Sequence, residues 1–336
     1  MVDIPTGRNS DQRIVNRRTA LQSLGVTGLA LAAGCVGDLS DDGDWPSRQV
    51  EIIVPWAAGG GADRTSRAIS EVAEEHTDES WSVSNQEGGS GSVGMNAVAT
   101  SDPDGHTIGV AAPEIALFEH LEIDEMGPDD ITPVMQYVEM PAALVVHEDA
   151  DYDSLDEFLE HAEDNPGDVQ MANSGSGSSW HMAAAGIADE AEIEVEHVAY
   201  DGADPAMTAV VNGEVDCTAV GAAEVAPQVQ DGDLAALGVA FEEEVDALPE
   251  VPTLQEQGLD IEIGSWLGHF VPTDTPDDVH DEIVDTYESV YDDDEFVDFA
   301  ESNNFMRVQR GPDEFHEFMQ EQYEYYGELL EDLDIE

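Results

Sequence analysis

Four glycine-rich loops set the fold class of this chain, because each one follows an apolar, strand-like run and precedes a helical run. They span residues 55–63, 87–94, 173–181 and 200–205, so that two fall in each half of the sequence. Short β-branched runs that alternate with amphipathic runs are typical of α/β proteins. The sequence therefore predicts an α/β chain built from two sets of strand–loop–helix units.

The remaining elements follow the same alternation. Strand-like runs in the first half cover 50–54, 81–85, 107–112, 131–138 and 144–147. Those in the second half cover 169–172, 195–200, 215–220 and 234–241. Between the halves, Ser154–Glu157 matches a helix capping box and marks a boundary.

The C-terminal part of the chain is predicted to be helical. Apolar residues recur there at helical spacing, which indicates faces that pack into a core rather than a ligand site: Val279, Ile283, Tyr287, Val290, Phe315, Phe318, Met319, Tyr326 and Leu329. We expect this tail to return and cover the first half. A chain that leaves one lobe, builds a second and comes back predicts a hinge of two or more strands.

The first 34 residues have the order of a twin-arginine export signal, with Arg17 and Arg18 before an apolar run and small residues at its end. Such a segment is removed after export. Cys35 follows Ala-Ala-Gly, which is similar to a lipobox, so we expect a lipid on Cys35; cleavage by an ordinary signal peptidase is the alternative. Residues 35–46 are small and acidic and predict a flexible linker. Cys217, left without a partner, is predicted to be a buried, inert thiol.

The charge balance limits the partners of the chain. It has 77 acidic and 9 basic residues, no lysine, and a net charge of -68. At molar salt the Debye length is about 3 Å, so such a surface is screened and stays hydrated. We interpret the excess as adaptation to an extremely salty environment rather than as a calcium or cationic-partner site. Nucleic-acid binding is excluded, because it requires clustered Lys and Arg.

The first glycine loop has the features of an anion site. Glycine allows close approach of a ligand, and the first turn of the following helix offers free N–H groups. A plain tight turn capped by Asp63 is the structural alternative. Arg64 and Arg67 follow in the first turns, where they either lean toward an anion or, as we expect, pair with surrounding acids.

The second loop contains a GxGxxG pattern at Gly89–Gly94, with Glu114 at about the distance of a ribose-binding acid. This pattern leaves an exported dinucleotide-dependent oxidoreductase as an alternative. The export signal counts against it.

The third loop places Ser178 three residues before His181, which raises the possibility of a hydrolase. No GxSxG elbow occurs and no orienting acid is evident, so a hydrogen-bonding role in the wall of a site is favoured for His181. Taken together, four loops at helix starts suit a small carboxylated ligand enclosed between two lobes.

At this level of detail the chain resembles the Bug family, the extracytoplasmic solute-binding proteins of tripartite tricarboxylate transporters. The resemblance runs in unbroken order over about residues 47–330, through Ile52–Asp63, Asn85–Thr107, Ser174–His181, His197–Gly202, Gly213–Asp216 and Leu248–Gly258.

The resemblance implies a two-lobed, type II-like periplasmic-binding fold with a hinge of crossing strands. Lobe 1 would comprise residues 47–147 and 262–336, and lobe 2 residues 148–261. It implies a monomeric, non-catalytic receptor without cofactor or metal, tethered by its lipid to the outer face of the cytoplasmic membrane. Such a receptor passes a small organic anion to a permease with one large and one small subunit. A sensor that presents its ligand to a membrane kinase is a further alternative.

The site residues of the family carry over by position. One wall of the site would consist of Trp56, Ala58, Gly59, Asp63, Gly89 and Ser90. The other would consist of Ser174, Ser176, His181, Tyr200, Gly202 and Ala203. Trp56 stands where the family often has Phe, and Ala199 replaces a common proline, so the identity of the anion is not implied.

Overall fold

A computed structural model describes residues 45–56, 58–152, 154–200 and 202–332. These residues belong to one compact unit, Gly43–Glu336. The predicted export signal, Cys35 and most of the linker lie outside the described residues. Within the described ranges, no helix combines the length and the apolar character needed to cross a bilayer.

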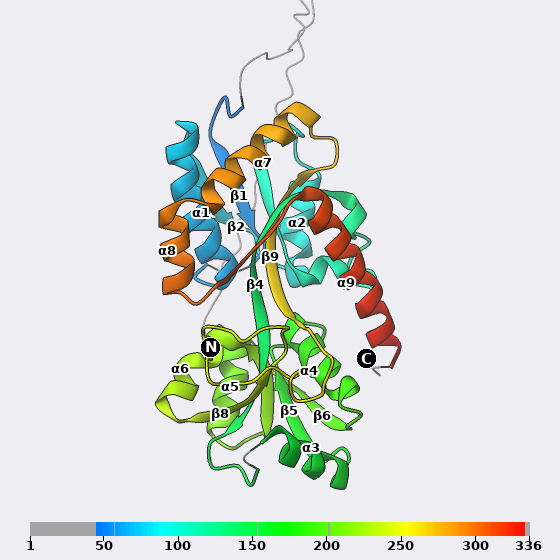
Figure 1. The fold of residues 1–336 in the computed structure, drawn as a ribbon. Helices are drawn as coiled ribbons and strands as arrows, with labels where there is room; N and C mark the ends of the chain where they lie inside the picture. The colour runs from blue at the N-terminus through cyan, green and yellow to red at the C-terminus, as the bar shows by residue number, and fades with distance from the viewer. Residues whose placement is uncertain (1–44, 57, 153, 201, 333–336) are drawn as a thin grey trace, which may run out of the picture. The chain divides into compact units, whose positions relative to one another are not determined.

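The first sheet carries the two glycine loops of the first half. Strands β1 (Val50–Val54), β2 (Trp81–Asn85) and β3 (Thr107–Ala111) are parallel, in the order β2-β1-β3. Beside β3 lies β9 (Gly264–Pro272), which is antiparallel to β3 and to β4 (Ile131–His147). The short strand β10 (Met306–Arg310) pairs with β4. Helices α1 (Gly61–Thr77), α2 (Ser92–Ala99), α7 (Asp277–Tyr291) and α8 (Asp294–Ser302) surround this sheet (Figure 1). We call this part the first lobe.

The second sheet repeats the arrangement for the second half of the chain. It consists of β5 (Val169–Asn173), β6 (Val195–Ala199), β7 (Cys217–Gly221), β8 (Leu234–Val239) and the C-terminal part of β4. Its helices are α3 (Leu155–Asp164), α4 (Ser179–Glu190), α5 (Ala203–Val211) and α6 (Ala222–Asp231). We call this part the second lobe, and the predicted α/β class is confirmed for both. Cys217 is fully buried, and burial raises the pKa of its thiol, as expected for an inert thiol.

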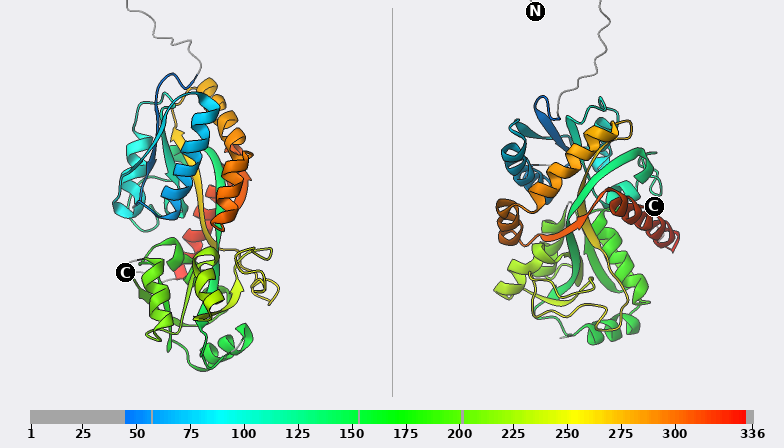
Figure 2. Two further views of the ribbon diagram at one scale, coloured as in Figure 1. Left: turned by 90° about the vertical axis from the view of Figure 1, so that its left-hand side faces the viewer. Right: turned by 45° about the horizontal axis from the view of Figure 1, so that its top comes forward.

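Two long strands, β4 and β9, connect the lobes (Figure 2). We predicted separate strands at 131–138 and 144–147, but β4 is continuous. It pairs with β9 as far as Pro141 and with β7 from Ala142 onward, so one strand serves both sheets. Gly264 of β9 lies opposite Pro141, where a Cβ atom would collide with the Met140 carbonyl oxygen. A hinge of crossing strands is therefore present, although the lobe boundaries given above stay a prediction.

The C-terminal helix α9 (Pro312–Asp332) corrects a second expectation, because it does not cover the first lobe alone. Phe315 and Met319 are buried in a first-lobe core, whereas Tyr326 and Leu329 are buried in the core of the second lobe. The last turns of α9 contact α4, where Gly186 leaves room for the Tyr325 hydroxyl group. The tail thus packs on both lobes.

Candidate ligand-binding site

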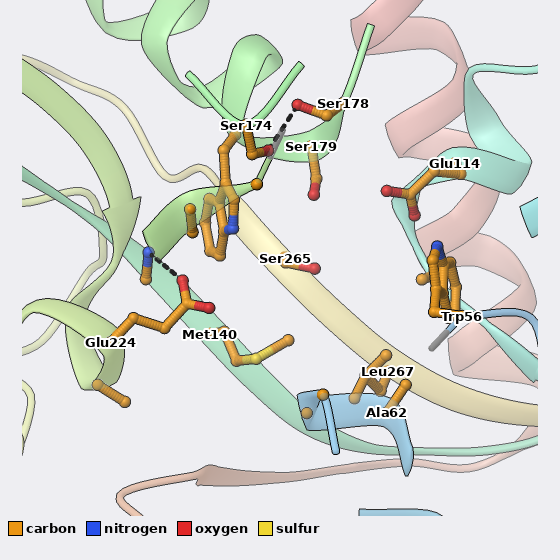
Figure 3. Close-up of a pocket in the computed structure, with 18 of the residues that line it drawn as sticks. Trp56, Ala62, Glu114, Met140, Ser174, Ser178, Ser179, Glu224, Ser265 and Leu267 are labelled. Atoms are coloured by element: carbon orange, nitrogen blue, oxygen red, sulfur yellow. Dashed lines mark hydrogen bonds between the residues drawn. The ribbon is translucent and has the colours of Figure 1, made fainter. Parts of the chain in front are cut away.

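A cavity of about 640 Å³ lies between the lobes, and residues from both sheets line it (Figure 3). The first lobe contributes Trp56, Gly60, Gly61, Ala62, Arg64, Ser90, Ala112, Glu114, Asn303 and Phe305. The second lobe contributes Ser174, Gly175, Ser176, Ser178, Ser179, Trp180, Gly202, Ala203, Gly221, Ala223 and Glu224. The hinge strands contribute Met140, Ser265 and Leu267.

The first loop opens the N-terminus of α1 to this cavity. Gly60 is the N-cap residue, in an extended conformation and without a side chain to bond the first-turn N–H groups. Asp63 is not the cap that we considered, because it lies at the third helical position and accepts from the Gly59 N–H at 2.9 Å. The free N–H groups of the first turn and the positive end of the helix dipole therefore favour an anion here.

Asp63 stabilises the conformation of the first loop through its hydrogen bonds. It is 3% exposed and accepts hydrogen bonds from Asn85 Nδ2 at 3.1 Å and from Arg67 Nη2 at 2.8 Å. The bond to Arg67, and after it those to Gly59 and Asn85, hold the pKa of Asp63 below its ordinary value against the effect of burial. The expected pairing of Arg67 with an acid is confirmed, whereas Arg64 faces the cavity.

The glycines of the second loop serve packing against the first loop. A Cβ on Gly91 would lie 3.1 Å from the Trp56 ring, and one on Gly94 would lie 2.8 Å from Pro55 Cα. Ser90, in the middle of the short 3-10 helix η1 (Gly89–Gly91), has a positive φ of 53° and lines the cavity. This loop therefore holds Trp56 in place and contributes one hydroxyl group.

The sheet order also bears on the dinucleotide alternative. A dinucleotide fingerprint requires the strand before the glycine loop and the strand after the helix to be neighbours, with the acid at the end of the second. Here the strands are β2 and β3, and β1 lies between them. The motif at Gly89–Gly94 therefore lacks the strand arrangement that the alternative needs.

The third loop presents hydroxyl groups from the second lobe. Ser178 is the N-cap of α4 and accepts from the His181 N–H, while its hydroxyl group lies 2.8 Å from that of Ser174. His181 Nδ1 accepts from the Gly177 N–H at 3.0 Å. Burial, with a smaller contribution from His197, lowers the pKa of His181 to about 4. The neutral ring of His181 thus shapes the loop from behind, and it forms no Ser–His pair with Ser178.

The fourth loop opens a second helix N-terminus to the cavity. Gly202 is the N-cap of α5, with φ of 123° and no side-chain cap, and Ala203 follows it. This backbone conformation is essentially restricted to glycine. The N-termini of α1 and α5 therefore reach the same cavity from opposite lobes.

Six of the predicted site residues line the cavity: Trp56, Ser90, Ser174, Ser176, Gly202 and Ala203. The other six lie behind or beside it: Ala58, Gly59, Asp63, Gly89, His181 and Tyr200. Tyr200 is half-buried, and its N–H bonds the Asn173 carbonyl oxygen at 3.0 Å. Only half of the site residues carried over from the family therefore line the cavity.

Several lining residues were missed because their neighbours in sequence indicate only packing. Met140, Ser265 and Leu267 belong to apolar strands, and Phe305 follows α8 just before β10. No local pattern marks these residues, since the hinge strands bring the first three to the cavity and the connection between α8 and β10 brings Phe305 there.

Three charged side chains face the cavity. Arg64 donates a hydrogen bond to Asn303 and lies 5.5 Å from the centre of the Phe305 ring. Glu224 accepts from the Gly221 N–H at 3.1 Å; desolvation by the cavity wall raises its pKa to about 7, although the side chain remains accessible from the cavity. Desolvation likewise raises the pKa of the half-buried Glu114 to about 7. Hydrogen bonds from its own N–H and from Ser179 favour the charged carboxylate, but their effect on the pKa is smaller.

Comparison with known proteins agrees with this architecture. Residues 65–335 match the family described as the tripartite tricarboxylate transporter family receptor, TctC. A UPF0065 protein from the tcbD-tcbE intergenic region of Pseudomonas sp. (strain P51) is 32% identical over 256 residues, which cover 75% of this chain and 76% of that protein.

Solved structures give the same result. A TctC solute-binding protein from Polaromonas superposes with a TM-score of 0.77 at 29% identity, over 86% of this chain and all of that one. MatC from Rhodopseudomonas palustris, solved with bound malate, has a TM-score of 0.73 at 25% identity, over 85% of this chain and 100% of its own. The predicted periplasmic-binding fold is confirmed, and this chain belongs to the tripartite tricarboxylate transporter receptor family.

Proposed function

We propose that this protein is a non-catalytic receptor that captures a small organic anion, a carboxylate, between its lobes outside the cell. The observation that carries the proposal is the pair of helix N-termini, of α1 and α5, that enter one cavity without a side-chain cap. Each offers N–H groups and a positive dipole end to a carboxylate. Six serine hydroxyl groups in the cavity wall supply further donors: Ser90, Ser174, Ser176, Ser178, Ser179 and Ser265.

The family supports a transport role for this site. The relative MatC holds malate in the same fold, which makes a dicarboxylate the first candidate. The closed, loaded form would deliver the anion to a permease with one large and one small subunit, and a lipid on Cys35 would keep the receptor near that permease. Genes for both permease subunits beside the gene of this protein would support delivery, whereas an adjacent histidine kinase gene would favour sensing.

Calorimetry in molar KCl tests the capture step. The purified protein is titrated with malate, succinate, citrate, terephthalate, glutamate and nicotinate, and saturable binding of at least one carboxylate is expected. Ser176→Asp, which adds a carboxylate to the cavity wall, is expected to weaken that binding about tenfold or more. Ser47→Asp adds the same charge at an exposed position outside the cavity and is the matched control. Absence of binding across the panel would contradict the proposal.

A further inference from the structure

Glu114 places a carboxyl group inside the cavity that the proposed function assigns to an anion. It lies in the 3-10 helix η2 (Pro113–Ala116), directly after β3, and its carboxyl group points into the cavity toward the side of Ser179 (Figure 3). Glu114 comes from the first lobe and Ser179 from the second. A bound carboxylate between the lobes therefore meets Glu114.

The charge of Glu114 has no compensating cation in the described part of the chain. None of the Arg or His side chains there lies within ion-pair distance of its carboxyl group. Arg64, which shares the cavity, is held by Asn303 and by the Phe305 ring. Two carboxylates in one desolvated site repel each other, and the usual outcome is that one of them takes up a proton.

The elements packed against η2 offer no alternative partner. From α9, the titratable group that faces Glu114 is Tyr326, and its pKa is raised by burial first and then by Tyr325 and Glu114. The ionisable residue of β9, His269, has its Nε2 3.2 Å from the Ser66 hydroxyl group, and burial lowers its pKa to about 3. Both groups stay neutral near neutral pH, so neither supplies a positive charge to Glu114.

Glu224, the second carboxyl group of the cavity, has a different environment. One of its oxygens accepts the Gly221 N–H at the N-terminus of α6, which favours the charged form and occupies that oxygen. Glu114 differs from Glu224 in position, because it comes from the first lobe and its carboxyl group points across the cavity toward Ser179 of the second lobe.

We propose that Glu114 is a specificity-determining residue whose carboxyl group is protonated in the complex and donates a hydrogen bond to the carboxylate of the bound anion. This inference rests on the proposed function. A neutral carboxylic acid supplies a donor without adding charge, and it rejects ligands that present a cationic group at that position.

The sign of the pH dependence follows from linkage. Free Glu114 is neutral below about pH 7 and charged above it, while a bound anion keeps it neutral to higher pH. Affinity is therefore full below about pH 7 and falls as the pH rises, because binding then requires the uptake of one proton. Between about pH 6 and about pH 8.5 we expect malate, ionised throughout, to bind about 30-fold more weakly at the higher pH.

Calorimetry of the whole protein with malate, in molar KCl and in two buffers of different ionisation enthalpy, measures the proton uptake directly. If malate is silent at low pH, the same titrations use succinate and then terephthalate. Glu114→Gln keeps a donor but cannot titrate, so its affinity is expected to stay within about threefold of the wild-type value at low pH and to lose the pH dependence. Glu125→Gln removes an exposed carboxylate from the same segment outside the cavity and should behave like the wild type.

Three outcomes would overturn the inference. Binding by the wild type without proton uptake would mean that Glu114 does not change its protonation. Loss of binding in Glu114→Gln at every pH would mean that Glu114 does not act as a hydrogen-bond donor to the anion, because the amide group of Gln supplies such a donor. Silence of the wild type toward all three anions at low pH, where neutral Glu114 is most favourable, would overturn this inference, and the proposed function falls with it when citrate, glutamate and nicotinate are silent as well.

Discussion

The two walls of the cavity present the same chemistry but are held in different ways. The N-terminus of α1 is positioned by the buried carboxylate Asp63, which gathers hydrogen bonds from the loop, from β2 and from α1 itself. On the second lobe, neutral hydroxyl groups such as Ser178 hold the third loop, and a left-handed glycine, Gly202, opens α5. In the first wall one buried carboxylate, Asp63, accepts the hydrogen bonds that stabilise the loop. In the second wall the stabilisation is divided among several weaker hydrogen bonds of hydroxyl groups.

The largest difference between the walls is expected in the free energy of unfolding when Asp63 or Ser178 is replaced by Ala. Asp63→Ala leaves the Gly59 N–H, Asn85 and Arg67 without their acceptor, and it should lower the free energy of unfolding by about 3 kcal/mol. Ser178→Ala removes an N-cap and should cost about 1 kcal/mol. Urea unfolding in molar KCl measures both, with Asp102→Ala, at an exposed position, as the control. Equal losses would show that the walls are held alike.

A smaller contrast concerns the two glycine caps. Gly202→Ala forces a side chain into a conformation with φ of 123° and should destabilise the protein by about 1–3 kcal/mol. Gly60→Ala meets an extended conformation with φ of -70°, so its effect on stability should stay below about 0.5 kcal/mol. Because Gly60 lines the cavity, its variant should instead weaken carboxylate binding. Thermal unfolding and calorimetry of the two variants separate the effect on stability from the effect on binding. A loss of stability in Gly60→Ala would contradict the expectation that Gly60 matters for binding and not for stability.

The smallest expected effect is that of salt. In the proposed function both walls bind the anion through backbone dipoles and hydroxyl groups, so the affinity should change by less than about threefold between one and three molar KCl. Arg64→Met should leave this salt dependence unchanged, since the guanidinium group is engaged by Asn303 and Phe305. A steep fall in affinity with salt in the wild type, absent from the variant, would show that Arg64 binds the anion directly.

Sequence patterns predicted the loop residues of the site but not its strand residues. Gly60, Gly61 and Ala203 lie in loops that the sequence marks, because glycine between a strand and a helix indicates an open helix start. Glu114 and Arg64 were noted, but for a ribose contact and for pairing with surface acids. Met140, Ser265 and Leu267 carried no signal, since an apolar strand that forms the floor of a cavity looks like any other buried strand.

Two features of the tertiary structure were predicted wrongly, because both depend on contacts between residues that are far apart in the sequence. Separate strands were predicted at 131–138 and 144–147, yet Gly264 lets β9 approach so closely that β4 continues through both sheets. The spacing of Phe315, Met319 and Tyr326 predicted a buried helical face but not that the face would divide between the cores of two lobes.

The sequence by itself determined the alternation of strands and helices, the open helix starts, the family and the excess of acidic residues, because these depend on local conformational preference, composition and motif order. Only the tertiary structure decided which loops share a cavity, since that depends on the order of strands in the sheets and on the crossing at Gly264. It also decided the position of Glu114: β1 separates β2 from β3, which removes the dinucleotide arrangement, and Glu114, just after β3, lines the cavity between the lobes.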